Sequence, residues 1–289
     1  AQRPLGPLVE QLRKGGCAVT LWEEEKRLTI SGQLRPGEYH LPGDVSSQFI
    51  SGMLFALPLL EGESIIRLTS PLESRGYVDM TRQVLRDRGI RVEELPEGFR
   101  VPGGQQYGRG TLGEEADYSQ AAFWLAAAGL GSPLTVDGLD PDSTQGDRCA
   151  VPYFQQLAGP GRVELDIAQC PDLAPALAVR AALRPGQTAR LVNAGRLRLK
   201  ECDRLAAIPE ELNKLGGQLT EGADFLEIRG VERLLGGVAD SHNDHRIAMM
   251  LAIAATRAEG PVVIEDWECV SKSYPNFFED YIMLGGSCQ

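Results

Sequence analysis

The sequence predicts an α/β protein of two domains, each built from repeated units of helices and strands. Two kinds of segment alternate along the 289 residues: a polar loop followed by a helix that is apolar nearly all round, and an amphipathic helix that ends at glycine. A strand is expected after each. Because a helix that is apolar on every side belongs inside a domain, we expect stacked units of about 70 residues. Their sheets would face solvent, with buried helices behind them.

Four segments are expected to contain the buried helices. Each carries Asp, Ser or Asn near its start, and such side chains accept hydrogen bonds from the exposed N–H groups of a helix. Each apolar run ends at a glycine or proline turn and continues as a strand. The segments are residues 43–68, 115–138, 166–193 and 240–266.

Five further segments are expected to contain half-buried helices. In the first of them, Leu5, Leu8, Val9 and Leu12 show the i, i+3, i+4, i+7 spacing that is typical of such a helix. The glycines that follow supply left-handed C-terminal caps. The segments are residues 3–21, 76–95, 148–166, 203–221 and 274–286.

The domain boundary is expected in the glycine-rich stretch 107–115, where the composition changes. We place the first domain at residues 1–113 and the second at residues 114–289. The chain length agrees with two domains, because one domain takes roughly 150 residues. Alternating polar and apolar residues at 27–32 and 225–230 predict strands with one exposed face.

Composition narrows the function classes. The net charge of −11 argues against a nucleic-acid binder, which would carry a basic face, but anionic small substrates need only a local basic cluster. No apolar run is long enough for a membrane helix, and no secretory signal opens the chain. The six cysteines form no CxxC pair, which favours reduced thiols and a cytoplasmic protein. His242 and His245 lack a zinc-ligand pattern, so we expect no metal site.

The stretch 196–217 is the clearest candidate for chemistry. Lys200, Glu201 and Arg204 crowd the start of a predicted helix. Basic groups beside a helix N-terminus make an anion site, because free N–H groups and the helix dipole both favour negative charge. A carboxylate among cations can donate or accept a proton. From the residues alone, a solvated charged face with Asp203 as a routine cap is the favoured interpretation.

The same stretch resembles a long signature of the 5-enolpyruvylshikimate-3-phosphate synthases. Other motifs of that family follow in the same order along the chain. The matching pieces are VSSQF at 45–49, ADYSQAAFW at 116–124, DSTQGD at 142–147, CPDLAPALAV at 170–179, KECDRL at 200–205, HNDHRIAM at 242–249 and CVSKSYPNFF at 269–278. The resemblance spans residues 1–289. It implies the two-domain enolpyruvyl-transferase fold, an inside-out α/β barrel type built of repeated βαβαββ units.

The resemblance also implies a reaction. Members of this family move the enolpyruvyl group of phosphoenolpyruvate onto the 5-hydroxyl of shikimate 3-phosphate and release phosphate. The expected partners are therefore these two small molecules, with no nucleic acid and no membrane. The family resemblance implies a monomer that needs no organic cofactor and no metal.

Several basic residues acquire expected roles from the motif match. Arg3, Arg204, Arg246 and Lys272 should hold the phosphate and carboxylate of phosphoenolpyruvate, and Lys200 should bind the shikimate side. Arginine suits both anions because its planar fork binds them bidentately. Without the motif context, Arg246 and Lys272 would be interpreted as ordinary surface charges.

Neutral polar residues are expected to bind shikimate 3-phosphate. By the same match, Ser46, Ser47 and Ser74 should hold the 3-phosphate, Gln48 should reach both substrates and Tyr77 should line the pocket. The simpler alternatives are that the two neighbouring serines only cap a helix and that the tyrosine is a half-buried core residue.

Two carboxylates are expected to move protons. Asp172 resembles the family's base near the 5-hydroxyl, although it could also cap the helix that follows it. Glu201 resembles the proton donor to the methylene carbon of phosphoenolpyruvate. Lys200 and Arg204 would lower the pKa of Glu201, whereas burial would raise it.

The chain departs from the family pattern in two ways. The family's first lysine-serine pair and its glycine-rich signature have no counterpart in this sequence. We therefore expect the chain alone to fold imperfectly, with Arg3 on a frayed terminus, and to need its own N-terminal fragment in trans for turnover. Arg196 stands where many members carry an asparagine.

Three alternatives to this enzyme remain. The sister enzyme that acts on UDP-N-acetylglucosamine shares the fold, but it typically uses a loop cysteine that has no counterpart here. A second alternative is an inactive fragment. A third is an anion-binding scaffold, which would be indifferent to the loss of Asp172 and Glu201.

Overall fold

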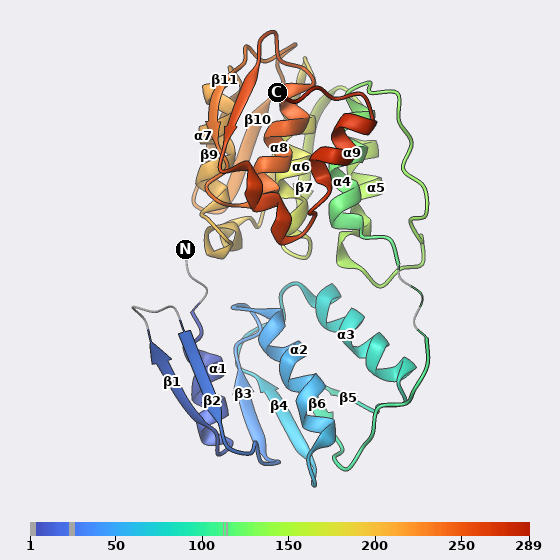
Figure 1. Ribbon diagram of the computed structural model, residues 1–289, viewed down its shortest axis with the longest axis vertical. Coiled ribbons are helices and arrows are strands. Elements are labelled where there is room, and N and C mark those ends of the chain that lie inside the picture. Colours follow the sequence, from blue (N-terminus) through green and yellow to red (C-terminus); the bar gives the residue numbers. More distant parts are fainter. Residues whose placement is uncertain (1–3, 23–26, 112, 114) are drawn as a thin grey trace. The chain divides into compact units, whose positions relative to one another are not determined.

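A computed structural model describes residues 4–22, 27–111, 113 and 115–289. The chain forms two compact units. We call the first the N-terminal unit; it contains the described residues up to 113 together with residues 144–146. The second, the C-terminal unit, contains residues 115–143 and 147–289. Figure 1 shows the elements of both units.

The N-terminal unit combines a hairpin, a four-stranded sheet and three α-helices. Its sheet has the order β3-β4-β6-β5, in which β3 and β4 are parallel and the other neighbours are antiparallel. The strands are β1 (Ala18–Trp22), β2 (Arg27–Ser31), β3 (Glu38–Leu41), β4 (Ser64–Leu68), β5 (Glu93–Leu95) and β6 (Gly98–Val101). The helices are α1 (Gly6–Lys14), α2 (Ser47–Ala56), the 3-10 helix η1 (Leu57–Leu59) and α3 (Arg75–Asp87).

The C-terminal unit contains a second four-stranded sheet and a parallel strand pair. The sheet has the order β7-β8-β10-β9, and β11 pairs with β12. The strands are β7 (Gly161–Asp166), β8 (Gln187–Val192), β9 (Gln218–Glu221), β10 (Phe225–Arg229), β11 (Gly237–Asp240) and β12 (Val262–Glu265). The α-helices are α4 (Tyr118–Gly129), α5 (Ala150–Gln156), α6 (Ala174–Ala182), α7 (Arg204–Lys214), α8 (His245–Ala255) and α9 (Phe277–Met283). The 3-10 helices are η2 (Gly146–Cys149), η3 (Pro171–Leu173), η4 (Gly195–Leu199) and η5 (Trp267–Lys272).

The two four-stranded sheets repeat one pattern. In each, a parallel pair joined through a buried helix is followed by an antiparallel pair: β3, β4, β6, β5 in one sheet and β7, β8, β10, β9 in the other. Within the described residues, β11 and β12 repeat only the parallel half of this pattern. The structure thus confirms the predicted repetition of helix and strand units.

The apolar helices lie in the core, as their composition predicted. Every residue of α6 is buried, and so are the residues of α8 from His245 to Ala254. In the view of Figure 1, α6 and α8 lie between β9, β10 and β11 on one side and α4, α5 and α9 on the other. An all-round apolar surface is stable only when other elements cover each face of the helix. None of the helices that the structure describes is long and apolar enough to cross a membrane.

One predicted strand is wrong. Residues 132–138 were expected to continue the apolar helix as a strand, but the structure assigns no strand there. A strand requires a neighbour along its hydrogen-bonding edge, and no described segment pairs with these residues. Its alternating sequence is therefore not sufficient to make it part of a sheet.

Residues 144–146 pack closely on the start of α3. A Cβ atom at Gly76 would lie 2.7 Å from both the N and the Cα of Gly146. Real Cβ atoms do not approach backbone that closely, so any side chain at Gly76 would displace this segment.

Candidate active site

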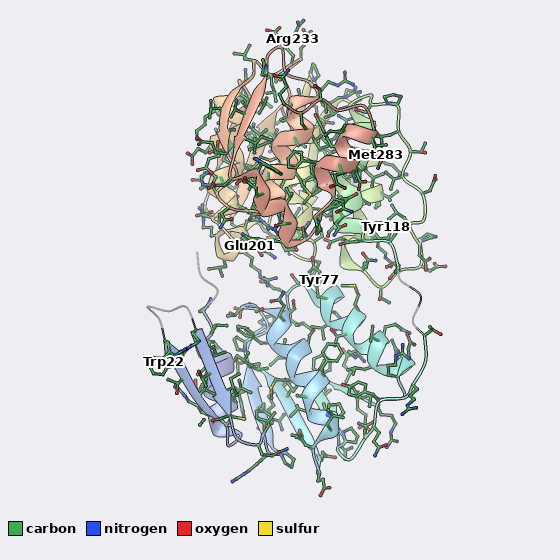
Figure 2. All side chains as sticks on the ribbon, in the orientation of Figure 1. Trp22, Tyr77, Tyr118, Glu201, Arg233 and Met283 are labelled. Carbon is green, nitrogen blue, oxygen red and sulfur yellow. The ribbon has the colours of Figure 1, made fainter. Side chains whose placement is uncertain are left out.

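Four helix starts converge in the C-terminal unit. The side chain of Arg246 in α8 reaches Ser119 at the start of α4, and Arg204 at the start of α7 reaches Asp172, which lies in η3 just before α6. Figure 2 shows Glu201 and Tyr118 at one end of this unit and Arg233 at the opposite end. Because the N-terminal ends of helices carry partial positive charge and free N–H groups, their convergence favours a bound anion.

Arg204 is the centre of this arrangement and is only 1% exposed. Its Nε and Nη2 donate to the two oxygens of Asp244 at 2.7 and 3.0 Å. Its Nη1 donates to Asp172 at 2.9 Å, and its Nη2 also reaches Glu201 at 2.8 Å. Burial would lower the pKa of the guanidinium, but the carboxylates of Asp244 and Asp172 outweigh burial and raise the pKa. Arg204 is therefore a permanently charged hub.

Asp172 receives three cations. Lys200 Nζ and Arg204 Nη1 each lie 2.9 Å from its Oδ1, and Arg246 Nη2 lies 3.4 Å from its Oδ2. Burial would raise the pKa of this carboxyl, but the charges of Arg246, Lys200 and Arg204 hold the pKa well below its usual range. Asp172 lies in the first turn of η3, two residues before α6 begins at Ala174. The structure therefore shows an ion-pair partner where the sequence also allowed a helix cap.

Glu201 is the more accessible of the two candidate proton-transfer groups. Its side chain is 31% exposed, compared with 18% for Asp172, and its Oε2 accepts from Arg204. It lies just before α7, whose start is capped by the side chain of Asp203 through the Ala206 N–H. Glu201 thus forms an ion pair with Arg204 from the turn just before the capped start of α7.

Lys272 lies at the end of η5 and is held by neutral oxygens. Its Nζ donates to the backbone carbonyl of Asn243 and, at 3.1 Å, to Asn243 Oδ1. Neither contact neutralises the ammonium charge, in contrast to the contacts of Arg204. Lys272 therefore offers an anion a pre-positioned positive charge.

In the N-terminal unit, Ser46, Ser47 and Gln48 lie at the start of α2. Ser46 and Ser47 are buried, and Ser46 occupies the cap position. The simple capping role expected for Ser46 is not observed, because in the described part of the chain its side chain makes no cap hydrogen bond. Its hydroxyl is thus not committed to the α2 amide groups.

Ser74 and Tyr77 lie at the start of α3, next to the loop before α2. The Glu73 N–H donates to the Gly43 carbonyl at 3.1 Å, which joins the two loops. Ser74 is buried in a left-handed conformation with φ of 52°, and Tyr77 is half-buried. The loops that lead into α2 and α3 are therefore neighbours in the structure.

Arg3 lies outside the described residues. Sequence patterns did not identify the groups that hold the cations, which are Asp244, Ser119 and Asn243. Asp244 caps α8 through the Arg246 N–H at 2.9 Å, so its position at a helix start was the available signal.

His245 was also missed. It is buried, its Nδ1 has no hydrogen-bond partner among the described residues, and burial together with Arg246 lowers its pKa to about 4. His245 is therefore neutral at physiological pH.

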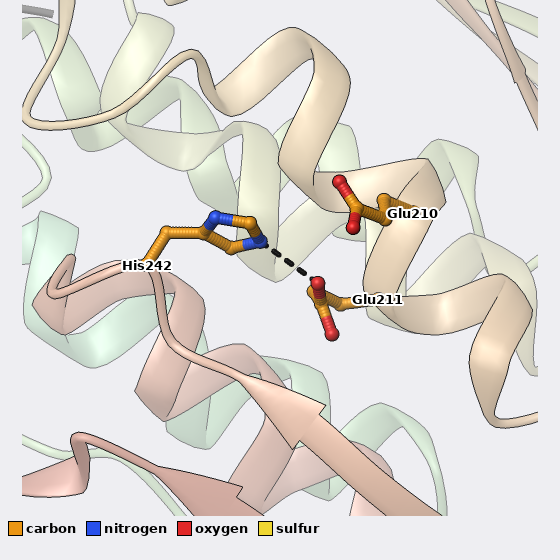
Figure 3. Close-up of side chains that lie close together, drawn as sticks. All are labelled: Glu210, Glu211 and His242. Carbon is orange, nitrogen blue, oxygen red and sulfur yellow. Dashed lines mark hydrogen bonds and ion pairs between the residues drawn. The ribbon is translucent and has the colours of Figure 1, made fainter.

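One described cluster has the residue types of a metal site. Ligand atoms of Glu210, Glu211 and His242 all lie within 4.8 Å of one another (Figure 3). Lys214 Nζ already binds Glu211 Oε1 at 2.7 Å and Glu210 Oε1 at 3.2 Å. Because this ammonium contacts the oxygens that a metal would need, the cluster is an ion-pair network in this structure.

Comparisons with known sequences give one family. Residues 1–281 match the profile of the family described as EPSP synthase (3-phosphoshikimate 1-carboxyvinyltransferase). A protein named 3-phosphoshikimate 1-carboxyvinyltransferase from Clostridium botulinum strain Alaska E43 is 45% identical over 304 residues, covering 99% of this chain and 70% of the relative. A protein of the same name from Clostridioides difficile is 43% identical over 302 residues, covering 99% of this chain and 69% of the relative.

Solved structures give the same architecture. An EPSP synthase from Acinetobacter baumannii superimposes with a TM-score of 0.79 at 25% identity, covering 99% of this chain and 71% of that protein. The enolpyruvyl transferase NikO from Streptomyces tendae has a TM-score of 0.69 at 18% identity, covering 99% of this chain and 72% of that one. The second similarity concerns the fold alone.

Proposed function

Because this chain belongs to the EPSP synthase (3-phosphoshikimate 1-carboxyvinyltransferase) family, we propose that the convergent helix starts of its C-terminal unit perform the chemistry of that enzyme. The family match also confirms the resemblance and the fold class that the sequence predicted. The enzyme transfers the enolpyruvyl group of phosphoenolpyruvate to the 5-hydroxyl of shikimate 3-phosphate and releases phosphate. The observation that carries our assignment is the contact of both Asp172 and Glu201 with one buried arginine, Arg204.

Phosphoenolpyruvate binds, in this proposal, to the cations of the C-terminal unit. Lys272 and Arg246 provide charge for its phosphate and carboxylate, with Arg204 behind them and Arg3 as a further contact. The support is physical: Lys272 is held by neutral oxygens, and Arg246 lies 3.4 Å from a carboxylate, which is a loose ion pair. A multiply charged anion competes well for cations whose present partners are neutral or loosely placed.

Glu201 and Asp172 divide the proton transfers. Glu201 gives a proton to the methylene carbon of phosphoenolpyruvate, and the 5-hydroxyl of shikimate 3-phosphate adds to the adjacent carbon while its proton passes to Asp172. The resulting tetrahedral intermediate then loses a methyl proton to a carboxylate and expels phosphate. The surrounding cations stabilise the charge that develops on the phosphate as it leaves.

Asp172 becomes a stronger base when substrate binds. Its pKa is low because three cations face it. When anionic substrates draw Lys200 and Arg246 away, the pKa of Asp172 rises toward its ordinary value and the carboxylate gains proton affinity. Substrate binding thus activates the base.

Shikimate 3-phosphate takes its phosphate contacts from the N-terminal unit. Ser46, Ser47 and Ser74 supply hydroxyl donors, and Gln48 and Tyr77 contribute polar contacts. The support is the position of these groups at the starts of α2 and α3, where helix N–H groups favour a phosphate. Lys200 contacts the shikimate side from the C-terminal unit. The proposal therefore assigns shikimate-phosphate binding to residues 1–113 and the chemistry to residues 114–289.

An N-terminal fragment of the same enzyme is a further proposed partner. This chain spans about 70% of the length of the clostridial relatives. The sheet pattern supports this partner. In both larger sheets an antiparallel pair follows the parallel pair, but within the described residues β11 and β12 have no such antiparallel pair, and an added fragment could supply it. The assembled enzyme acts in the cytoplasm as a monomer, where its cysteines stay reduced.

The test uses Glu201→Gln and Asp172→Asn, with Glu210→Gln as the matched surface control. Phosphate release is measured by the chain with and without the N-terminal segment of a relative, and substrate binding is measured by calorimetry. The two site variants should lose about 10²–10⁴-fold in turnover, with substrate affinity changed about threefold or less. The control should match the unmodified chain.

Two results would oppose the proposal. Unchanged turnover in both site variants would favour an anion-binding scaffold. No binding of either substrate, even with the added segment, would leave the family membership but remove the assigned roles.

A further inference from the structure

Glu211 is a fully buried carboxylate whose two oxygens hold one turn. On the last part of α7 it is 0% exposed. Its Oε1 bonds His242 Nε2 at 2.8 Å, and its Oε2 accepts the Asp240 N–H at 2.9 Å. Figure 3 shows His242 reaching across to Glu211 on the helix. A buried carboxylate is stable only when its oxygens are paired, so these bonds fix Glu211 and the turn together.

The turn from Asp240 to Asp244 has an unusual backbone. His242 and Asn243 are both left-handed, each with φ of 52°. Two successive non-glycine residues in this conformation are strained, and such strain persists only when surrounding contacts determine it. The His242 bond to Glu211 and the His242 N–H bond to Asp240 at 2.7 Å are such contacts.

This strained turn carries the partners of two cations. Asn243 supplies both oxygens that hold Lys272, and Asp244 supplies the carboxylate that forks onto Arg204. Arg204 and Glu211 are the first and eighth residues of α7, so about two helical turns separate them on one face. Helix α7 therefore contacts both ends of the turn: Glu211 bonds Asp240 at its start, and Arg204 bonds Asp244 at its end.

We propose that Glu211 is a positioning residue: by fixing His242, it sets the turn that places Lys272 and Arg204 for the phosphate-bearing substrate. This inference rests on the proposed function for its ligand and on the geometry of the turn for its mechanism. Glu211 touches neither the substrate nor the reacting atoms. A purely structural role would change stability without changing the surroundings of Lys272.

The first experiment reads Lys272 directly and needs no ligand. The unmodified chain, Glu211→Gln and Glu210→Gln are acetylated with N-hydroxysuccinimidyl acetate, and the rate at each lysine is measured by mass spectrometry. In Glu211→Gln the amide replaces one carboxylate oxygen, so the turn loosens, and Lys272 should react about threefold faster relative to Lys14 as local opening releases its amine from the Asn243 oxygens. Lys200, which forms an ion pair with Asp172, should be unchanged, and so should every lysine except Lys214 in Glu210→Gln.

A second variant guards against failure to fold. His242→Asn keeps a residue that tolerates the left-handed conformation but is too short to reach Glu211, and the buried carboxylate retains Lys214 and Asp240. It should raise the Lys272 rate in the same direction. Rates at Lys272 that match the Glu210→Gln control in both variants would overturn the proposal.

Calorimetry with phosphoenolpyruvate, in the presence of shikimate 3-phosphate and the N-terminal segment, separates the two proposals. Glu211→Gln should bind phosphoenolpyruvate about tenfold more weakly, because small displacements of positioned groups are costly. If the unmodified chain binds none while Lys272 still responds, the proposed function fails and the positioning role stands. If binding is normal in every variant and Lys272 does not respond, the positioning role fails alone.

Discussion

The two units place their charges differently. In the N-terminal unit, ion pairs such as Arg82–Glu94 and Arg67–Glu38 have partly exposed side chains, 19–42% exposed. In the C-terminal unit, Arg204 and Asp244 are 1% and 0% exposed and lie at the centre of the helix starts. The sheet pattern is the same in both units, but among the described residues the buried charged side chains lie in the C-terminal unit.

This difference separates two ways of recognising an anion. Helix starts with serine hydroxyls can bind a phosphate through neutral donors, and they cost little to leave empty. Buried ions must be mutually paired at all times, because each unpaired charge in the interior is costly. In the function proposed here, the buried ions take part in the proton transfers and the loss of phosphate, and the serines bind the substrate phosphate.

The largest effect should come from breaking a buried ion pair. Arg204→Met leaves Asp244 and Asp172 without their main partner, and we expect a loss of about 3–5 kcal/mol in the free energy of unfolding. Arg82→Met in the N-terminal unit is the matched change, and its loss should be about 1 kcal/mol or less. Urea denaturation of both variants measures the contrast. Equal losses of unfolding free energy in the two variants would mean that burial does not make the Arg204 ion pairs more important for stability than those of Arg82.

A pH effect should follow from His245. Burial and Arg246 lower its pKa to about 4 in the folded chain, from 6.5. Below pH 6.5 the unfolded chain takes up a proton that the folded chain refuses, so stability is lost as the pH falls toward 4. We expect a loss of about 1–2 kcal/mol between pH 7 and pH 5. Asp172 adds nothing in this window, because a lowered carboxyl pKa costs stability only below its ordinary value of 3.8.

The control is His245→Gln, measured by urea denaturation at both pH values. This variant should flatten the dependence. A slope that persists would assign the loss to other groups.

The smallest expected effect is a difference in stability loss between substitutions at the N-cap positions of two helices. Asp117 caps α4 through the N–H groups of Ser119 and Gln120, so Asp117→Ala should cost about 1 kcal/mol of stability. Ser46 occupies the equivalent position of α2 without a side-chain cap bond in the described structure, so Ser46→Ala should cost less than about 0.5 kcal/mol. The same serine change should weaken binding of shikimate 3-phosphate. Thermal melts and calorimetry test both statements, and a full capping loss at Ser46 would contradict the second.

Sequence patterns predicted the local features well. The all-round apolar run at 174–182 specified a buried helix, because no other environment covers every face of it. The charged stretch around Arg204 specified where cations and carboxylates gather. The strand expected at 132–138 is absent from the structure, and its absence could not be predicted from these residues, since a strand depends on a neighbour that local sequence does not reveal.

The hydrogen-bond and ion-pair partners of the charged residues could not be predicted from the sequence. Arg204 pairs with Asp244, 40 residues away, and Arg246 reaches Ser119, 127 residues away. Nothing in a local window selects one carboxylate among many, because the selection is made by the packing of separate helices. Glu211 is a similar case: its helical position predicts a buried face, but not the turn that it holds.

The docking of residues 144–146 has a consequence for the order in which the chain matures. Most of the N-terminal unit is synthesised before the C-terminal unit, yet its last piece is made only after α4, which belongs to the other unit. Domains generally fold as units during synthesis, starting from the N-terminus. Here the first unit stays unfinished at Gly76 until Gly146 has been made, so the two units complete their folding in overlapping periods.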